Sequence, residues 1–405
     1  MILQLIRVLM LAMIVFISGC STFQAIKMVN GGEVAADSQV ESVIPFTLKG
    51  HPILVKARIN RSQKEYTFFF DTGALTIIRQ EVAKELGLPK GIELEATDIS
   101  GSSKKIELVK ADIIAGGMEV KDCATGVTDF SDLLPSDIAG ILGSNFFRHF
   151  AVTIDYRKKE ITFSRKSRQA NAQLKEITIP FEPSMKNGFA PMIECMVDNS
   201  IEVSAIIDTG FPGTAALSLP LLKQTGAFKR GSAVSAKGCM LRGLFGAAKE
   251  EFYGLRIDQL MIGDLKLNNI PAISQHSKAE ILLLGNRFLD RYLVTLDYPA
   301  KRMILTPNGA HVETNIITYG IALTKHDRKT VVSGVWNSST AAAQGVEVGD
   351  EVEKVNSVDA ARFSLIELTG MFQDEKINTV ELELVNAKGA RKINLHKEML
   401  LPALQ

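Results

Sequence analysis

Two aspartates of this chain stand in the same local sequence, each followed by a threonine and a glycine. Asp71 ends the apolar run of YTFFFDTGALT (66–76), and Asp208 ends that of VSAIIDTGFPGT (203–214). One such tripeptide predicts only a turn after a strand, because Asp and Gly are common turn residues. Two carboxylates held close together predict more, since like charges cannot both ionise cheaply and one pKa falls while the other rises. Such a pair can take a proton from water and give one to a carbonyl oxygen.

The surroundings of the two aspartates also repeat. Ile44-Pro45-Phe46 recurs as Ile179-Pro180-Phe181, about 25 residues before each aspartate. Downstream, GILGSNFFRHFAVTIDYRKKEITF (140–163) aligns without a gap to LLLGNRFLDRYLVTLDYPAKRMIL (282–305), which matches Asp155-Tyr156 to Asp297-Tyr298. A long ordered repeat of strand-like segments predicts two similar β-rich lobes. The clear helical segments are short: residues 79–86, residues 220–225, and the stretches after Leu142 and Leu284.

A second marker completes each half of the repeat. Two hydrophobic residues and a glycine follow each Asp-Thr-Gly, as Ile141-Leu142-Gly143 and as Leu283-Leu284-Gly285. Together these motifs resemble the retropepsin-like and pepsin-like aspartic proteases, over roughly residues 44–306. The resemblance implies a mainly β fold with two acid-protease β-barrel lobes in one chain. A retropepsin carries one motif and dimerises, whereas this chain can supply both aspartates itself; its oligomeric state stays open.

The resemblance also implies roles for the motif residues. Asp71 and Asp208 would be the catalytic pair that activates a shared water, with their individual roles unassigned. Thr72 and Thr209 would brace the two lobes through a mutual hydrogen-bond network.

The glycines and two loops complete the expected site. Gly73 and Gly210 permit a tight turn in which backbone N–H groups approach a carboxylate. The family also has a mobile hairpin over the cleft. We expect that hairpin at residues 97–103 in the first lobe and near residues 237–240 in the second, because both stretches are polar and contain glycine.

Three residues depart from the family pattern. Family members commonly carry Ser, Thr or Asp two residues beyond the glycine, where the side chain hydrogen-bonds a catalytic carboxylate. Leu75 and Pro212 stand there and cannot make that bond, and Phe211 replaces the usual small residue. These departures predict altered pH dependence, narrow specificity, or a lobe pair kept for binding rather than cleavage.

The N-terminus reads as an export signal rather than as part of the fold. One positive charge precedes an uninterrupted apolar run at residues 8–17, which is too short for an ordinary membrane span. The run ends in Ile17-Ser18-Gly19-Cys20, which resembles the lipobox of bacterial lipoproteins and implies cleavage before Cys20 and its lipidation. We therefore expect a signal peptide at 1–19 and a tether at 20–42.

Location follows from this resemblance. A lipid on Cys20 would anchor the protein in the bacterial cell envelope, and Ser21 resembles the pattern that sorts lipoproteins to the periplasmic face of the outer membrane. The alternative is a simple anchor or cleaved signal with an incidental cysteine.

Composition excludes several functional classes. The 405 residues carry 46 basic and 45 acidic side chains, a net charge of +1, which gives no electrostatic reason to expect nucleic acid as a partner. Six scattered histidines show no metal-ligand spacing, so we expect neither a metal nor another cofactor. Cys123, Cys195 and Cys239 allow at most one internal disulfide, and we expect all three to be small buried hydrophobic residues.

The pattern changes after about residue 311. A strand-like run at 330–335 precedes NSSTAAAQGVEVGDEVEKVNSVD (337–359), with a small-residue helix after Ser339 and a strand into Asn356. This order resembles an α+β PDZ domain, a module that binds the C-termini of extended peptides as an added strand. The resemblance places the carboxylate-binding loop at Gly320, Ile321, Ala322 and Leu323, with alanine where glycine is more usual. The alternative is a generic α+β appendage.

These observations predict lobes at 43–168 and 175–308 and a PDZ domain at 311–400. The expected activity is that of an aspartic-type endopeptidase that hydrolyses peptides or proteins, with the PDZ domain recruiting substrates or partners or gating the cleft. The competing hypothesis is a catalytically inactive protease fold that acts as a binding scaffold of the envelope. A third is an enzyme that processes itself once and is otherwise silent.

Overall fold

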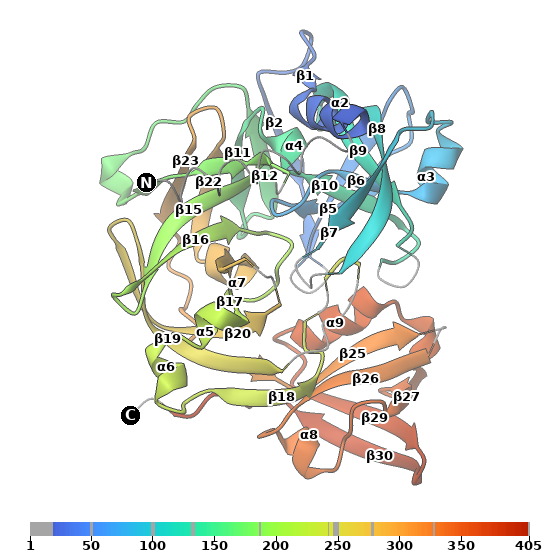
Figure 1. Ribbon diagram of the computed structural model, residues 1–405, viewed down its shortest axis with the longest axis vertical. Coiled ribbons are helices and arrows are strands. Elements are labelled where there is room, and N and C mark those ends of the chain that lie inside the picture. Colours follow the sequence, from blue (N-terminus) through green and yellow to red (C-terminus); the bar gives the residue numbers. More distant parts are fainter. Residues whose placement is uncertain are drawn as a thin grey trace, which may run out of the picture.

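The computed structural model describes residues 19–48, 52–98, 102–130, 134–185, 188–241, 243–245, 251–276, 279–326 and 329–403, with the backbone alone for residues 19–22, 172 and 184. The protein is mainly β, as predicted. Figure 1 shows two lobes, one blue to green and one green to yellow, and an orange to red C-terminal domain beside them.

Lobe 1 is built on one mixed sheet. Its described strands follow the order β1-β9-β6-β10-β5-β4-β8-β7, with β3 paired to β4. They are β1 (Glu33–Val34), β3 (Thr47–Leu48), β4 (Ile53–Ile59), β5 (Tyr66–Asp71), β6 (Ile77–Arg79), β7 (Ile92–Thr97), β8 (Ser103–Ala115), β9 (Met118–Thr128) and β10 (Ile138–Gly143). Aromatic and β-branched residues dominate β5, whose alternate side chains Tyr66, Phe68 and Phe70 enter the core.

Lobe 2 repeats this arrangement strand by strand, except that no described strand of lobe 2 corresponds to β1. Its described strands follow the order β14-β15-β16-β21-β17-β20-β19-β18. They are β14 (Glu182–Ser184), β15 (Ala190–Val197), β16 (Ile201–Ile207), β17 (Ala215–Ser218), β18 (Val234–Gly238), β19 (Phe252–Ile262), β20 (Leu265–Gln275) and β21 (Ile281–Leu284). In both lobes the strand before Asp-Thr-Gly runs parallel to the strand of the second marker, β5 to β10 and β16 to β21.

A six-stranded sheet joins the lobes. Its order within the described residues is β13-β23-β22-β11-β12-β2, so three strands come from each half. They are β2 (Glu41–Pro45), β11 (Ala151–Asp155), β12 (Glu160–Ser164), β13 (Ile177–Pro180), β22 (Tyr292–Asp297) and β23 (Arg302–Pro307). At its centre Thr153 faces Thr295, with 2.8 Å between their hydroxyl oxygens. The two repeats therefore meet about an approximate two-fold axis at this pair.

The described helices of the two lobes are short, as the sequence predicted, and the described residues also form the unpredicted helix α2. The helices in the described residues are α2 (Gly19–Asn30), α3 (Gln80–Glu85), α4 (Ser144–Phe147), α5 (Leu219–Leu222), α6 (Gly226–Lys229), α7 (Asn286–Leu289), α8 (Thr340–Ala343) and α9 (Leu365–Gln373), with 3-10 turns at Ala172–Leu174 and Ala360–Arg362. Helices α4 and α7 follow the glycine of the second marker in each lobe.

The expected tether at residues 20–42 is wrong for most of its length. Residues 19–30 form α2, β1 pairs with β9, and β2 begins at Glu41 and pairs with β12. Burial explains the difference, because Ala35 is only 3% exposed and Val34 packs against the core of lobe 1. The stretch is polar on average, but these two apolar side chains are enough to hold it against lobe 1.

The C-terminal domain has its own core and shares a sheet with lobe 2. Strand β18 pairs with β26, where Ala236 faces Trp336, so the sheet of lobe 2 continues into the domain. Trp336 and Leu400 pack with Phe252 of lobe 2 at this junction. The strands of the domain are β24 (Ile317–Thr318), β25 (Ile321–His326), β26 (Lys329–Trp336), β27 (Glu351–Val355), β28 (Val358–Asp359), β29 (Thr379–Asn386), β30 (Gly389–His396) and β31 (Glu398–Met399).

Candidate active site

The two aspartates lie at equivalent ends of the two sheets. Asp71 is the last residue of β5 and faces Gly143 in the parallel strand β10. Asp208 directly follows β16, and its N–H donates to the carbonyl of Leu284 in β21 at 2.9 Å. The second marker of the sequence therefore fixes the strand beside each aspartate.

The two threonines join the lobes through four hydrogen bonds. The N–H of Thr72 donates to Oγ1 of Thr209 at 3.0 Å, and the N–H of Thr209 donates to Oγ1 of Thr72 at 3.0 Å. Each hydroxyl then donates to a backbone carbonyl of the other lobe, Thr72 to Ile207 at 2.6 Å and Thr209 to Phe70 at 2.9 Å. Both threonines are fully buried, so this reciprocal network sets the spacing of the two aspartates.

Each motif glycine lies against the carboxyl group of the opposite lobe. A Cβ on Gly73 would come within 2.8 Å of Cγ of Asp208, and a Cβ on Gly210 would come within 2.4 Å of Oδ2 of Asp71. Real Cβ atoms do not approach other atoms so closely. Glycine is therefore required here for the approach of the two lobes.

The carboxyl groups differ in the donors they receive. Oδ1 of Asp71 accepts one backbone N–H, from Gly73 at 2.7 Å. Oδ1 of Asp208 accepts two, from Gly210 at 2.8 Å and Phe211 at 3.1 Å. Because a donated N–H favours the charged carboxylate, this difference favours the negative charge on Asp208.

Electrostatics agree with that assignment. Surrounding protein raises the pKa of Asp71 well above its usual range through burial, and the charge of Asp208 raises it further. Burial also raises the pKa of Asp208, but its two backbone N–H donors and a hydrogen bond from the Asp71 carboxyl oppose that shift. Both side chains keep partial exposure to solvent, so a water can reach them. The pair is thus arranged to hold one shared proton, with Asp71 as the protonated partner.

The three residues that depart from the family pattern are all at least half-buried. Leu75 is half-buried against Gly188 of lobe 2, and Pro212 is half-buried beside its own motif. Neither supplies a donor to a carboxylate. Phe211 is only 5% exposed, because its ring lies in an apolar cluster of lobe 2. Its size is therefore accommodated inside lobe 2.

Two apolar clusters flank the aspartates. Side chains two apart in a strand share a face, so Phe69 lies on the side of Asp71 and Ile206 on the side of Asp208. We name the first cluster the lobe 1 wall: Leu54, Phe69, Ile77, Phe130, Leu134, Ile138 and Ile141. The lobe 2 wall comprises Ala190, Ile206, Phe211, Ala216, Ile281 and Leu283. Leu241 packs against the lobe 2 wall and Leu244 against the lobe 1 wall.

The hairpin expected at residues 97–103 forms between β7 and β8, where Thr97 faces Ser103. Residues 99–101, its expected tip, lie outside the described residues. At its base the Asp98 carboxylate accepts N–H groups from Ser102 and from Phe245 of lobe 2. A hydrogen bond thus joins the lobe 1 hairpin to the segment at 243–245 of lobe 2.

The second expected hairpin has an additional partner. Lys237 and Gly238 belong to β18, which pairs on one side with β19 and on the other with β26 of the C-terminal domain. Cys239 continues this contact, since its N–H donates to the carbonyl of Ser333 at 2.7 Å. Unlike β7, this strand is therefore held by a separate domain.

The sequence did not predict four polar side chains behind the threonines. Ser144 and Asn286 follow the glycines of the second marker and donate to the carbonyls of Thr72 and Thr209. Tyr298 and Tyr156 contact these two side chains from the opposite lobes. The matched Asp-Tyr pairs of the repeat were the signal that could have identified the tyrosines.

The predicted PDZ loop lies in the C-terminal domain, away from the aspartate pair. Gly320 has φ +84°, and a Cβ there would meet Ser339 at 2.4 Å. Ile321, Ala322 and Leu323 begin β25, which pairs with β26 and has a bulge between Ala322 and Leu323. Helix α9 packs beside β25, and its Ile366 also contacts the lobe 1 wall.

The cysteines lie apart from the aspartate pair. Cys123 and Cys195 are free and buried, as expected, and burial raises the pKa of each thiol to about 12. Cys239 is only half-buried, so that part of the prediction is wrong. The side chain of Cys20 and residues 1–18 of the expected signal peptide at 1–19 lie outside the described residues. No helix in the described part of the chain is long and apolar enough to cross a membrane.

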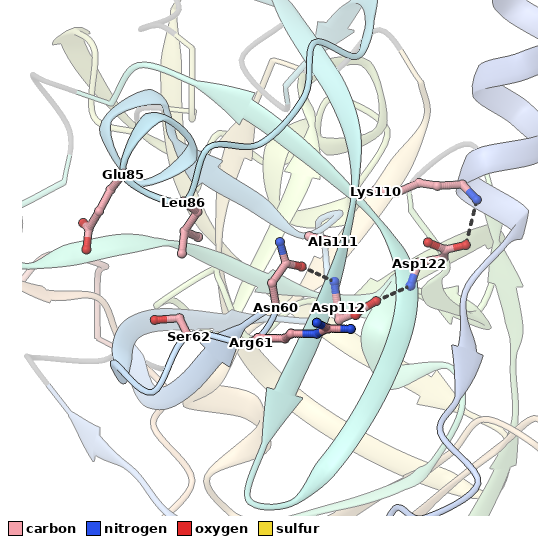
Figure 2. A pocket seen from close by; sticks show the side chains of 9 residues that line it. All are labelled: Asn60, Arg61, Ser62, Glu85, Leu86, Lys110, Ala111, Asp112 and Asp122. Carbon is pink, nitrogen blue, oxygen red and sulfur yellow. Dashed lines mark hydrogen bonds and ion pairs between the residues drawn. The ribbon is translucent and has the colours of Figure 1, made fainter.

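A polar hollow on lobe 1 lies apart from the aspartates (Figure 2). Its side chains pair mainly with one another: Lys110 with Asp122 at 2.9 Å, and Asn60 with the N–H of Asp112 at 2.8 Å. Across the described residues, no group of three or more His, Cys, Asp or Glu side chains could hold a metal ion.

Comparison with known proteins bears on the first lobe. The sequence model of a family described as aspartyl protease matches residues 55–146. This stretch is similar to an aspartyl protease domain. It spans β4 to α4 and contains Asp71, Thr72 and Gly73. No curated protein matches the chain.

Two solved structures are similar to the chain. An aspartic proteinase from Irpex lacteus is 14% identical with a TM-score of 0.43, and the match covers 68% of this chain and 99% of that chain. A structure titled edgp is 11% identical with a TM-score of 0.41, covering 68% of this chain and 96% of that chain.

Proposed function

We propose that the protein is an aspartic-type endopeptidase that hydrolyses peptide bonds through a water held between Asp71 and Asp208. The observation that carries this proposal is the pair of carboxyl groups at the lobe boundary, each of which lies against the motif glycine of the opposite lobe. Such a site is costly to keep, because two acids surrounded by protein repel each other when both are ionised. A scaffold has no use for that arrangement.

The geometry supports separate roles for the two acids. Asp208, with two N–H donors, is the base and takes a proton from the water as its oxygen bonds to the substrate carbonyl carbon. Asp71 gives its proton to the carbonyl oxygen. Collapse of the tetrahedral intermediate breaks the C–N bond; the proton on Asp208 passes to the leaving nitrogen, and one hydroxyl of the intermediate returns its proton to Asp71. The lobe 1 and lobe 2 walls suit apolar side chains on both sides of that bond.

The test is cleavage of an unfolded protein by the wild type, Asp71→Asn and Asp208→Asn between pH 4 and 8. We expect each variant to lose about 100- to 10,000-fold in kcat/KM, which is the contribution of general acid–base catalysis. Asp122→Asn, in the hollow of Figure 2, is the matched control and should cleave like the wild type. An inactive wild type, or a variant as active as the wild type, would refute the proposal.

A scaffold without activity is the second candidate. The observation that favours it is the position of Leu241 and Leu244, which cover parts of both walls. Leu75 and Pro212 add to it, since neither donates to a carboxylate. The cleavage assay separates the two functions. If the protein processes itself once, the intact mass of freshly purified wild type will be smaller than that of Asp71→Asn.

We further propose that the C-terminal domain is a PDZ domain that binds peptide C-termini and recruits substrates or partners. Its support is the β25 strand, whose described pairing is with β26 alone and which lies beside α9. Gly320 fits a loop that offers backbone N–H groups to a carboxylate. Peptides ending in a free carboxylate should bind, and their amidated forms should bind at least about tenfold more weakly. Equal affinity would refute carboxylate recognition.

We also propose that Cys20 carries a lipid that anchors the protein at the periplasmic face of the outer membrane. The support is the sequence Ile17-Ser18-Gly19-Cys20 after an apolar run. Labelling with a fatty acid should mark the wild type and leave Cys20→Ser unmarked, and the variant should leave the membrane fraction. Labelling of both proteins would contradict this assignment.

A further inference from the structure

Two tyrosines connect each lobe to the active site of the other. Tyr156 follows β11 of lobe 1, and its hydroxyl donates to Oδ1 of Asn286 in lobe 2 at 2.7 Å. Tyr298 follows β22 of lobe 2, and its hydroxyl lies 2.7 Å from Oγ of Ser144 in lobe 1. These contacts are related by the approximate two-fold axis of the repeat.

The direction of each hydrogen bond follows from its acceptor. Oγ of Ser144 is 2.8 Å from the carbonyl oxygen of Thr72, which can only accept, so Ser144 donates there. Tyr298 must then donate to Ser144. In the other half, Nδ2 of Asn286 donates to the carbonyl of Thr209 at 2.6 Å. Both series of hydrogen bonds therefore run from a tyrosine hydroxyl, through one side chain, to a threonine carbonyl.

The chains end at the catalytic carboxyl groups. The Thr72 carbonyl belongs to the same peptide unit as the N–H of Gly73, which donates to Asp71. The Thr209 carbonyl likewise shares a peptide unit with the N–H of Gly210, which donates to Asp208. Hydrogen bonds in series polarise one another, so a donor to the carbonyl makes the N–H a stronger donor.

We propose that Tyr156 and Tyr298 are positioning residues, each of which strengthens the backbone N–H donated to the aspartate of the opposite lobe. Tyr298 of lobe 2 acts on Asp71 of lobe 1, and Tyr156 of lobe 1 acts on Asp208 of lobe 2. The inference deepens the proposed function and rests on it, because these carboxyl groups are the proposed catalytic pair.

Burial keeps both tyrosine hydroxyls protonated, and nearby charges add to its effect. Burial raises the pKa of Tyr298, and the charge of Asp71 raises it further. Burial raises the pKa of Tyr156 well above its usual range, and the charge of Asp290 adds to the shift. Among the described residues, Asp71 and Asp208 are the charged groups that face each other.

The variants Tyr156→Phe and Tyr298→Phe remove one hydroxyl each and keep the buried ring. A weaker N–H leaves a carboxylate less stabilised, so the pKa of its acid rises. Tyr156→Phe should raise the lower of the two apparent pKa values of the pair, which is governed by Asp208. Tyr298→Phe should raise the higher value, governed by Asp71. We expect shifts of about 0.3 pKa unit.

The shifts are measured by 13C NMR titration of the aspartate carboxyl carbons, assigned with Asp71→Asn and Asp208→Asn. In the pH profile of kcat/KM, Tyr156→Phe should move the acidic limb to higher pH and Tyr298→Phe the alkaline limb. Ser144→Ala, which interrupts the same chain one step later, should reproduce the shift of Tyr298→Phe. Tyr292→Phe, a buried tyrosine of β22 outside both chains, is the control and should move neither value.

A purely structural role would lower activity or stability without separating the two values. Unchanged pKa values, or equal shifts of both values in both variants, would overturn the inference. The NMR titration needs no turnover, so it decides the inference even if the wild type cleaves no substrate. Failure of the cleavage assay alone would refute the proposed function and leave the titration result standing.

Discussion

The two lobes share one strand order, yet they hold their aspartates differently. The threonine network is the same from either side, and each motif glycine lies against the opposite carboxyl group. The donors are not the same: Asp71 receives one backbone N–H, and Asp208 receives two. The symmetric threonine network therefore sets the distance between the two acids. The turn after each aspartate sets how many N–H donors it receives, and so which acid carries the charge.

The two expected hairpins differ in a second way. In lobe 1, β7 is the last strand in the described order of its sheet and pairs with β8. In lobe 2, the equivalent strand β18 pairs with β19 and also with β26 of the C-terminal domain. One loop is thus a hairpin at the end of a sheet, and the other is part of a sheet that a second domain continues (Figure 1).

The largest expected effect tests the symmetric part of the comparison. Thr72→Val and Thr209→Val each remove a hydroxyl and leave one buried N–H and one buried carbonyl without a partner. Each variant should lose about 4 kcal/mol in free energy of unfolding, because an orphaned buried group costs about 1–3 kcal/mol. Urea unfolding measures both losses. Losses that differ by more than about 2 kcal/mol would show that the network is not reciprocal.

The motif glycines should show a smaller and unequal effect. Gly210→Ala would bring its Cβ within 2.4 Å of the Asp71 carboxyl, whereas Gly73→Ala would approach that of Asp208 to 2.8 Å. Both should lower kcat/KM by about 100-fold, as expected for displacements of about 1 Å, and Gly210→Ala should be the worse. Steady-state kinetics decides the order. Full activity in either variant would contradict the close approach of the lobes.

The third effect concerns the pH dependence of stability. The pKa of Asp71 is raised above 3.8 in the folded protein, so the folded state binds this proton more tightly than the unfolded state does. Its contribution to stability is present below about pH 4 and is lost as the pH rises toward the folded pKa, at about 1.4 kcal/mol per pH unit. Asp71→Asn lacks this loss. Its stability relative to the wild type should therefore increase from pH 4 to 7 in thermal unfolding, and a constant difference would argue against a raised pKa.

The smallest effect separates the two loops. Amide hydrogens of β18 should exchange more slowly than those of β7 by about tenfold or more, because β18 is hydrogen-bonded on both sides. Asp98→Ala removes the bond between the loops and should speed exchange in β7 while leaving β18 nearly unchanged. Equal rates in the two strands would show that the C-terminal domain does not hold the lobe 2 loop.

The aspartate pair and the strands could be predicted because their signals are local or repeated in the sequence. Asp71 and Asp208 were identifiable because each ends an apolar run in a repeated motif, and the strands followed from alternating burial of residues such as Phe68 and Phe70. Contacts made by the fold itself were not predictable. The bond between Tyr156 and Asn286 joins residues 130 apart in sequence, and it depends on the register of β11 with β22.

Two further differences have the same origin. We predicted a tether at residues 20–42 because this stretch has few apolar side chains. In the structure, however, Ala35 is buried and β1 pairs with β9 of lobe 1. We predicted a mobile hairpin at residues 237–240 because this stretch is polar and contains glycine. Its pairing with β26 depends on residues about 100 positions later and could not be predicted from the stretch itself. Edge pairing between domains depends on which strands meet in space, which local composition does not specify.

The central claim is that Asp71 and Asp208 share one water and one proton. The most direct measurement is a crystal structure with a peptide analogue whose scissile amide is replaced by a tetrahedral carbon bearing a hydroxyl group. We expect the hydroxyl to lie between the two carboxyl groups, within hydrogen-bond distance of both, with Leu241 and Leu244 displaced from the walls. An analogue bound only at the C-terminal domain, or lobes too far apart for one hydroxyl to reach both acids, would contradict it.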